Sequence, residues 1–199
     1  PYEYLLVAPR VDGAAPPRSP AQNQFRDVND SVHRNNIEIL FAEGITKGCN
    51  PPINDMYCPR EELTRGQVAA FLRRNLALPA SEQDFFTDDS ASVFEDDINA
   101  LTAAGIGFGC TETTFCPDVP LTRAEMAEYL VRTYGFENSE GTDFFTDDGT
   151  SPHQDAINAL FANDITVGCS DEAPLYCPDD SLTREQMATF LARSLGLGT

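Results

Sequence analysis

The chain has 199 residues, 41% of them hydrophobic, and its 13 Lys and Arg face 32 Asp and Glu, a formal net charge of −19. A nucleic-acid-binding protein neutralises phosphates with Lys and Arg, so this charge excludes nucleic acid as a partner. No apolar run approaches the roughly 20 residues that a membrane helix needs, so we expect no membrane insertion. The apolar fraction still suffices for a folded core.

The acidic excess is concentrated in the second half of the chain. Residues 1–24 hold two acids and two bases, and residues 25–80 hold seven of each. Residues 81–144 hold fourteen acids and two bases, and residues 145–199 hold nine and two. The first part is therefore balanced, whereas the other two carry net charges of −12 and −7.

Residues 1–24 differ in composition from the rest and are predicted to form an extended arm or linker. Residues 2–7 are apolar and β-prone, and residues 14–20 are rich in Pro and Ala. Two interpretations remain open: a remnant of a preceding segment, or an arm that adds a strand or an apolar contact to a neighbouring subunit.

Five landmarks then recur three times, at a spacing of about 60 residues. Each copy starts with Phe-x-Asp and continues with Ile-x-x-Leu, a turn ending in Gly-Cys, an aromatic-Cys-Pro triplet and Leu-Thr-Arg. The first landmark begins at Phe25, Phe86 and Phe145, and the last begins at Leu63, Leu121 and Leu182. We therefore divide the chain into residues 25–80 (repeat 1), 81–144 (repeat 2) and 145–199 (repeat 3).

Each repeat is predicted to contain two helices. The first has apolar side chains at i, i+3 and i+4, as in Ile37, Leu40 and Phe41, which share one helical face. Glycine after this stripe, as in Gly44, favours the left-handed cap that ends a helix. Helices this short are unstable alone, so the three helix-pair repeats are expected to pack into one all-α domain, with at most short extended pieces in the loops.

The second helix of each repeat is predicted to begin at the Thr of Leu-Thr-Arg. Thr followed three residues later by Glu or Gln forms a capping box, in which each side chain bonds the backbone of the other residue. The three boxes are Thr64 with Gln67, Thr122 with Glu125, and Thr183 with Gln186.

Six cysteines fall two per repeat, at the same landmarks. We expect three local disulfides, Cys49–Cys58, Cys110–Cys116 and Cys169–Cys177, each pinning one loop. Zinc is the alternative, but two Cys per loop with no nearby His or third thiol do not complete a tetrahedral site, so no metal site is predicted. Disulfides place the protein outside the cytoplasm. No signal peptide is visible, which suggests a mature chain or a fragment.

Together these landmarks resemble the S-layer homology domain, a family that usually carries three tandem copies. The resemblance covers residues 25–195 and is strongest in repeat 2, where Leu121 opens the run Leu-Thr-Arg-Ala-Glu. It implies a pseudo-threefold arrangement of helix pairs that anchors surface proteins to secondary cell-wall polysaccharide. In the family, the Arg of this motif lies in a groove between repeats and contacts a negatively charged pyruvylated sugar. The candidate glycan-binding residues are thus Thr64, Arg65, Thr122, Arg123, Thr183 and Arg184.

The sequence departs from the family pattern in two ways. Val32, Val93 and Pro152 stand where the family usually has Trp, with His33, Phe94 and His153 beside them. The paired cysteines are an addition to the pattern and suggest a disulfide-bearing branch.

Two alternatives concern the charged residues. An Arg at the first helical position opposes the helix dipole, so its recurrence indicates either an internal pair with a carboxylate or anion binding in a groove. The acids Asp88, Asp89, Asp147 and Asp148 are expected to be solvated or to cap helices, and Ca²⁺ binding is the less favoured alternative because their spacing fits no EF-hand.

No nucleophile–base set or nucleotide loop recurs, so we expect neither an enzyme nor a cofactor. Two functions remain open for a secreted or cell-surface protein. One is a module that anchors to an anionic cell-wall polysaccharide through grooves between repeats. The other is a structural subunit that binds neighbouring copies of itself in a surface layer or filament, using the arm and the charge asymmetry.

Overall fold

The structure is a computed structural model that describes residues 24–138 and 140–197. The predicted arm therefore lies outside the described residues, except for Gln24. The described part contains six helices: α1 (Arg34–Ala42), α2 (Arg65–Leu76), α3 (Glu95–Ala103), α4 (Arg123–Tyr134), α5 (Gln154–Ala162) and α6 (Arg184–Ser194). Only isolated β-bridges accompany them there, so the predicted all-α fold is confirmed. None of the described helices has the length and apolar character that crossing a bilayer requires.

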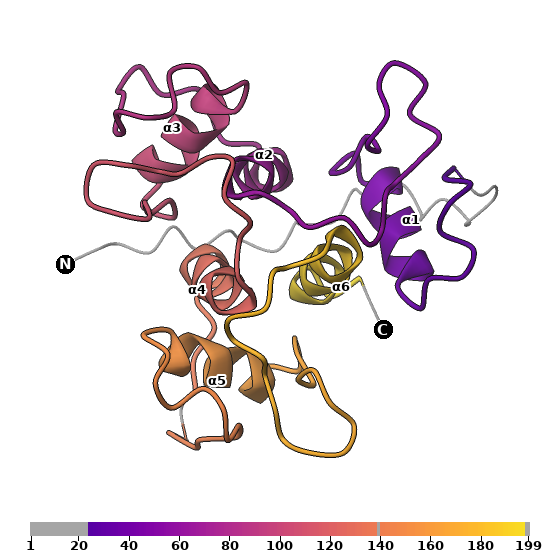
Figure 1. Cartoon of the computed structure of the whole chain (residues 1–199), viewed down its shortest axis with the longest axis vertical. Helices are drawn as coiled ribbons and strands as arrows, with labels where there is room; N and C mark the ends of the chain where they lie inside the picture. Colours follow the sequence, from indigo (N-terminus) through magenta and orange to yellow (C-terminus); the bar gives the residue numbers. More distant parts are fainter. Residues whose placement is uncertain (1–23, 139, 198–199) are drawn as a thin grey trace, which may run out of the picture.

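The six helices form three packed pairs around a common centre. Figure 1 shows α2, α4 and α6 nearly end-on around the centre, with α1, α3 and α5 and their loops outside them. The pairs in contact are α2 with α3, α4 with α5, and α6 with α1. Each pair thus joins the second helix of one repeat to the first helix of the next, and the third pair closes the ring.

The inner helices α2, α4 and α6 begin where the sequence predicts. In all three, the Thr side chain accepts a hydrogen bond from the N3 backbone, and the N3 side chain accepts one from the Thr backbone. The predicted capping boxes are therefore confirmed. Each outer helix is followed by a residue with a left-handed backbone. This residue is Gly44 after α1 (φ 74°), Gly105 after α3 (φ 75°) and Asp164 after α5 (φ 60°).

The three Leu of the Leu-Thr-Arg motif lie fully buried at the centre. The Leu63 N–H donates to the Leu182 carbonyl at 2.9 Å, the Leu121 N–H to that of Leu63 at 2.9 Å, and the Leu182 N–H to that of Leu121 at 2.8 Å. These bonds form a closed cycle in which the carbonyl of each repeat accepts a backbone hydrogen bond from the next repeat. The repeats consequently share one core rather than three separate ones.

Each inner helix inserts its N-terminus into the loop of the following repeat. The backbone N–H groups of Arg65 and Gly66 donate to the carbonyls of Val119 and Pro117, both at 2.9 Å. The equivalent donors of α4 and α6 bond loop carbonyls of repeats 3 and 1 in the same way. The first N–H groups of a helix have no partner within the helix, so these contacts supply the missing acceptors.

Candidate functional site

The predicted glycan-binding arginines lie where one repeat meets the next, and we call these places junctions 1, 2 and 3. Junction 1 holds Arg65 of α2 against the loop of repeat 2. The Arg65 side chain is only 1% exposed. Its Nε donates to the Phe115 carbonyl at 2.8 Å and its Nη2 to the Phe108 carbonyl at 2.5 Å. The guanidinium also lies 5.0 and 5.3 Å from the centres of the Phe115 and Phe108 rings.

Junction 2 repeats this geometry with Arg123 of α4 and the loop of repeat 3. Arg123 Nε donates to the Tyr176 carbonyl at 2.9 Å, and Nη2 donates to the Gly168 carbonyl at 3.5 Å. The Tyr176 hydroxyl donates in return to the Arg123 carbonyl at 2.9 Å. The guanidinium lies 4.8 Å from the centre of the Tyr176 ring, within the range of a cation–π contact.

Junction 3 closes the ring by joining Arg184 of α6 to the loop of repeat 1. Arg184 Nε donates to the Tyr57 carbonyl at 2.7 Å, and Nη2 donates to the Gly48 carbonyl at 3.4 Å. Burial lowers the pKa of the Arg184 guanidinium and raises that of the Tyr57 phenol above its usual range. Gly48 has φ 87°, and a Cβ at this position would lie 2.6 Å from the Met56 carbonyl. Only glycine therefore fits at residue 48, whose carbonyl accepts the hydrogen bond from Arg184.

The three junctions differ in whether the buried cation has a carboxylate partner. Arg65 Nη1 forms an ion pair with Glu125, so the internal-pair interpretation holds for this residue. Among the described residues, neither Arg123 nor Arg184 has a carboxylate within ion-pair distance, although each is at most 6% exposed. Carbonyl oxygens and ring faces are their only partners in that part of the chain. The next residue of α6, Glu185, instead accepts a hydrogen bond from Ser31 at 2.6 Å.

Each predicted glycan-binding Thr has its hydroxyl engaged in the capping box. Thr64, Thr122 and Thr183 accept N–H groups at 3.3, 3.1 and 3.4 Å. The structure therefore places these hydroxyls beside the junction arginines, where they fix the start of the helix that carries each Arg.

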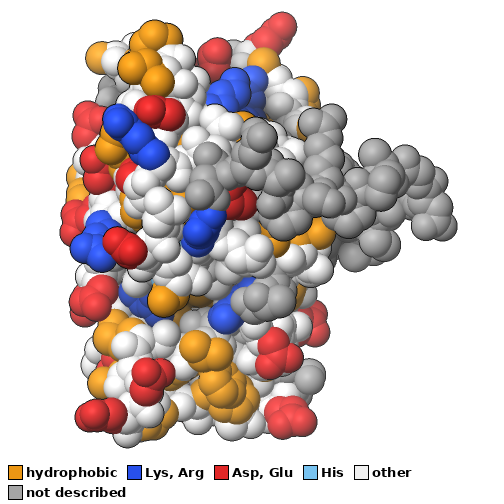
Figure 2. All heavy atoms as spheres, turned by 90° about the vertical axis from the view of Figure 1, so that its right-hand side faces the viewer, with side chains coloured by type: hydrophobic (Ala, Val, Ile, Leu, Met, Phe, Trp, Pro, Cys, Tyr) orange, Lys and Arg blue, Asp and Glu red, His pale blue; other side chains and the backbone are white. Residues whose placement is uncertain are grey.

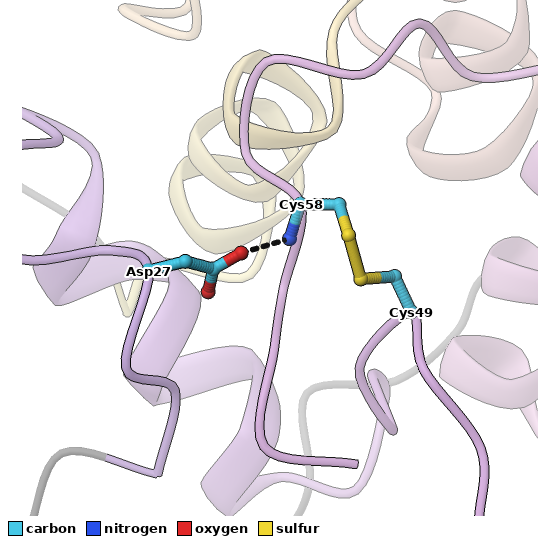
Figure 3. A group of neighbouring side chains, drawn as sticks. All are labelled: Asp27, Cys49 and Cys58. Atoms are coloured by element: carbon cyan, nitrogen blue, oxygen red, sulfur yellow. Dashed lines mark hydrogen bonds between the residues drawn. A yellow bond between two sulfur atoms is a disulfide. The ribbon is translucent and has the colours of Figure 1, made fainter.

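The three predicted disulfides are present, with Cα–Cα distances of 6.0, 6.0 and 6.1 Å. Figure 3 shows Cys49 bonded to Cys58 and the carboxylate of Asp27 pointing at the backbone N of Cys58. Asp27 accepts the N–H groups of Tyr57 at 2.8 Å and Cys58 at 2.7 Å. The two sulfur atoms are bonded to each other, so this Asp-Cys-Cys group offers no thiolate to a metal ion.

The Asp of Phe-x-Asp holds the disulfide loop, a role that the sequence analysis did not predict: it left Asp27 unassigned and expected Asp88 and Asp147 to be solvated or to cap helices. Asp88 and Asp147 each accept two N–H groups in the same manner as Asp27. The second Cys of every pair has a left-handed backbone, with φ of 57–58°. Its N–H points at the carboxylate, which holds the loop in this uncommon conformation. The available signal was the Asp itself, which stands at the same position in all three repeats.

The neighbouring acids Asp89 and Asp148 are fully buried, contrary to the expectation of solvated side chains. Both carboxylate oxygens of Asp89 lack a hydrogen-bond partner among the described residues, and so does Oδ1 of Asp148. Burial raises the pKa of both carboxyl groups, and nearby acids raise it further. Val28 holds the same position in repeat 1, where it is also fully buried.

His33, Phe94 and His153 stand just before the outer helices and contact the preceding inner helix. His33 Nδ1 lies 2.7 Å from the Thr189 hydroxyl. His153 Nδ1 lies 3.5 Å from Glu128 Oε2. These side chains pack between repeats. Val32 and Val93, which stand where the family usually has Trp, are 92% and 88% exposed.

The outer surface of repeat 1 does not present a uniformly basic face. In Figure 2, Lys and Arg side chains lie among Asp and Glu on the side of the molecule formed by α1 and α6. A hollow of about 710 Å³ beside junction 3, between the loop of repeat 1 and the start of α6, is lined by Asp30, Glu61 and Glu185 together with Arg60. Its acidic lining disfavours an anionic ligand in this hollow.

Comparison with known proteins identifies the family that the middle repeat resembles. The sequence model of the S-layer homology domain matches residues 85–127. The chain is 28% identical over 198 residues to the S-layer protein sap of Bacillus anthracis, covering 95% of this chain and 23% of that protein. It is 30% identical over 166 residues to an endoglucanase of Bacillus sp. strain KSM-635, covering 80% of this chain and 17% of that protein.

A third relative is the surface-layer 125 kDa protein of Lysinibacillus sphaericus, 26% identical over 195 residues and covering 96% of this chain and 16% of that protein. The chain spans less than a quarter of the length of each of these three relatives. Residues 85–127, in the middle repeat, thus match the S-layer homology domain family, and this match, the surface-layer proteins among the relatives and the three disulfides indicate a protein that is secreted or lies at the cell surface.

Proposed function

We propose that this protein is a non-enzymatic anchoring module that binds an acidic cell-wall polysaccharide at the junctions between its repeats. The observation that carries the proposal is the state of Arg123 and Arg184. Each guanidinium is buried between two repeats and, among the described residues, has no carboxylate partner. The surface-layer relatives and the family resemblance support a wall polysaccharide as the source of the missing anion.

These two arginines favour an anionic ligand because a buried charge without a partner has a high free energy. Removing a cation from water costs several kcal/mol unless an opposite charge or sufficient hydrogen bonds replace the water. Carbonyl oxygens at Tyr176 and Tyr57 supply part of this replacement. An incoming carboxylate supplies the rest, and charge-assisted hydrogen bonds to Arg are stronger than neutral ones.

The test is co-sedimentation of the full chain with bacterial cell-wall sacculi that carry their acidic polysaccharide. We expect binding that weakens with salt and is lost when the wall carboxylates are amidated with a carbodiimide. If the ligand is attached to the wall through phosphate, binding is also lost with sacculi that hydrofluoric acid has stripped of phosphodiester-linked polymers. Equal binding to amidated and untreated sacculi would refute an anionic carboxylate ligand.

Self-association is the second candidate, and the charge split favours it, since repeat 1 is balanced while repeats 2 and 3 are strongly acidic. When a basic side chain of repeat 1 binds the acidic surface of a neighbouring copy, the contact is head-to-tail. Such contacts build open chains of copies unless the chain of copies closes into a ring. Light scattering after size exclusion decides: a monomer without wall that binds sacculi supports anchoring, and salt-sensitive oligomers support assembly.

A further inference from the structure

Asp89 is a buried carboxylate in the segment that leads from the Phe-x-Asp motif of repeat 2 to helix α3. Its side chain is fully buried, and neither of its oxygens accepts a hydrogen bond among the described residues. Taking a charged group out of water is unfavourable unless hydrogen-bond donors or an opposite charge replace the water. The Asp89 carboxylate therefore needs a positive partner that the described side chains do not provide.

Two further carboxylates lie near Asp89 and lead from it to the surface. The charges of Asp84 and Glu95 both raise the pKa of Asp89, which burial already raises. Asp84 is exposed, and Glu95, the first residue of α3, is half-buried. Among the described residues, none of the three forms an ion pair with Lys or Arg. Three carboxylates thus lie together in this part of the chain without a cation.

Repeat 3 shows how amide groups bind the carboxylates at the same positions. Asp143 and Asp148 stand where repeat 2 has its two aspartates. Asn158 Nδ2 donates to Asp148 Oδ2 at 3.1 Å and lies 3.5 Å from Asp143 Oδ1. Gln154, the first residue of α5, donates from Nε2 to Asp143 Oδ2 at 3.1 Å. Two amide groups therefore supply hydrogen bonds to this pair of carboxylates.

Repeat 2 lacks both of these donors. Glu95 takes the place of Gln154, so an additional carboxylate replaces the Nε2 donor. Asn99 takes the place of Asn158, and its Oδ1 accepts the Phe85 N–H at 3.1 Å. The Nδ2 of Asn99, however, donates to no carboxylate among the described residues. The charge at this place is therefore larger in repeat 2 than in repeat 3, and fewer hydrogen bonds compensate it.

Repeat 1 has no acidic cluster at this place. The fully buried Val28 replaces the buried aspartate, and Arg34 is the first residue of α1. An apolar and a cationic side chain offer no ligand to a positive ion. Repeat 1 therefore serves as an internal reference in which the same fold forms without the carboxylates.

We propose that repeat 2 binds one Ca²⁺ ion between Asp84, Asp89 and Glu95, at a site that repeats 1 and 3 do not share. Ca²⁺ prefers oxygen ligands and tolerates irregular geometry, whereas Mg²⁺ requires a near-ideal octahedron and Zn²⁺ favours nitrogen and sulfur. In the structure the three carboxylates do not all lie within 4.8 Å of one another, so the ion draws the Asp84 and Glu95 side chains, which solvent reaches, onto Asp89. The site goes beyond the proposed function and does not depend on polysaccharide binding.

The first test is a calorimetric titration of the full chain with CaCl₂, after EDTA treatment and transfer to chelator-free buffer. We expect one site per chain with a Kd of about 10⁻⁴–10⁻³ M, the range of extracellular calcium modules, and binding of MgCl₂ that is weaker by about tenfold or more. The melting temperature should rise with CaCl₂, because the ion binds the folded chain. A chain with neither saturable binding nor this rise would overturn the proposal, and so would equal responses to the two salts.

Asp89→Val tests the buried ligand with a residue that repeat 1 already carries at this position. Without calcium, the variant should melt at a higher temperature than the unchanged protein, because it lacks the buried charge. Added CaCl₂ should raise the melting temperature of the unchanged protein and leave that of the variant unchanged. Calcium binding that persists in Asp89→Val would place the ion elsewhere and overturn the site.

A matched pair of substitutions tests why repeat 2 differs from repeat 3. Glu95→Gln should weaken Ca²⁺ binding by about tenfold or more, and Gln154→Glu should add a second site per chain. Glu112→Gln is the control, since it removes one charge from the exposed disulfide loop of repeat 2 and should leave the Kd unchanged. An equal loss of binding in Glu112→Gln and Glu95→Gln would show attraction to the net charge alone and overturn the proposal. A Gln154→Glu variant with one site would overturn the role assigned to Glu95.

Discussion

Arg184 and Tyr57 lie 127 residues apart in sequence and form two reciprocal hydrogen bonds. Arg184 Nε donates to the Tyr57 carbonyl, and the Tyr57 hydroxyl donates to the Arg184 carbonyl, both at 2.7 Å. Because Arg184 starts the last helix and Tyr57 lies in the loop of repeat 1, this pair joins the last repeat to the first.

The first prediction concerns this closure. Arg184→Ala removes both side-chain donors and leaves the Tyr57 carbonyl without its partner in the core. We expect the free energy of unfolding to fall by about 2–4 kcal/mol, measured by denaturant unfolding. Arg60→Ala, in the exposed part of the same loop, is the control and should change it by less than about 0.5 kcal/mol. Equal effects of the two substitutions would argue against a structural role for junction 3.

The second prediction concerns the unpartnered carboxylate of Asp89. Its pKa is raised by burial, so it favours the folded state below the unfolded pKa of about 4 and loses this contribution as the pH rises. Asp89→Val should therefore stabilise the protein at pH 7 by about 1–3 kcal/mol, with a smaller gain at pH 3. The mirror variant Val28→Asp should destabilise it at pH 7. A pH-independent effect of Asp89→Val would show that side-chain shape, not charge, matters there.

The third prediction concerns Glu128 in the contact between α4 and α5. Its hydrogen bond with His153 lowers the pKa of Glu128 to about 2, and Arg132 adds to this, although burial opposes it. A lowered carboxyl pKa stabilises the folded state above the unfolded value, and this stability is lost as the pH falls from about 4.5 to about 2. Glu128→Gln should thus cost about 1–3 kcal/mol at pH 6 and little at pH 2. Thermal unfolding at the two pH values tests this, and an equal cost at both would contradict it.

The fourth prediction concerns the disulfides. Each closes a short loop, so replacing both Cys49 and Cys58 by Ser should lower the free energy of unfolding by about 2–3 kcal/mol. Peptide mapping without reduction should recover each pair from within one repeat. A bridge between repeats would contradict the loop geometry, in which an Asp carboxylate also holds the second Cys.

Much of the local structure followed from sequence, because its causes are local. The capping boxes need only a Thr and a Glu or Gln three residues apart, and the disulfides need only two Cys in one loop. The pairing of α2 with α3 did not follow, since a stripe such as that around Ile37 indicates a buried face but not which helix covers it. The loop-holding role of Asp27 was also missed, since its partners are backbone groups about 30 residues away.

The difference between Glu125 and Gln186 was hidden for a related reason. Both residues serve a capping box equally well, so within one repeat they appear equivalent. Glu125 differs because its carboxylate also forms an ion pair with Arg65 of the preceding repeat. That contact forms only when consecutive repeats pack against each other.

The cycle of hydrogen bonds among Leu63, Leu121 and Leu182 also fixes the copy number of the unit. An open stack of repeats grows or shrinks at its ends, because each unit contacts only its neighbours. Here every backbone donor of the cycle is already matched, so a fourth copy has no place to insert, and two copies leave the cycle broken. Diversity in such an architecture therefore has to come from changes within the three junctions and loops, not from lengthening the array.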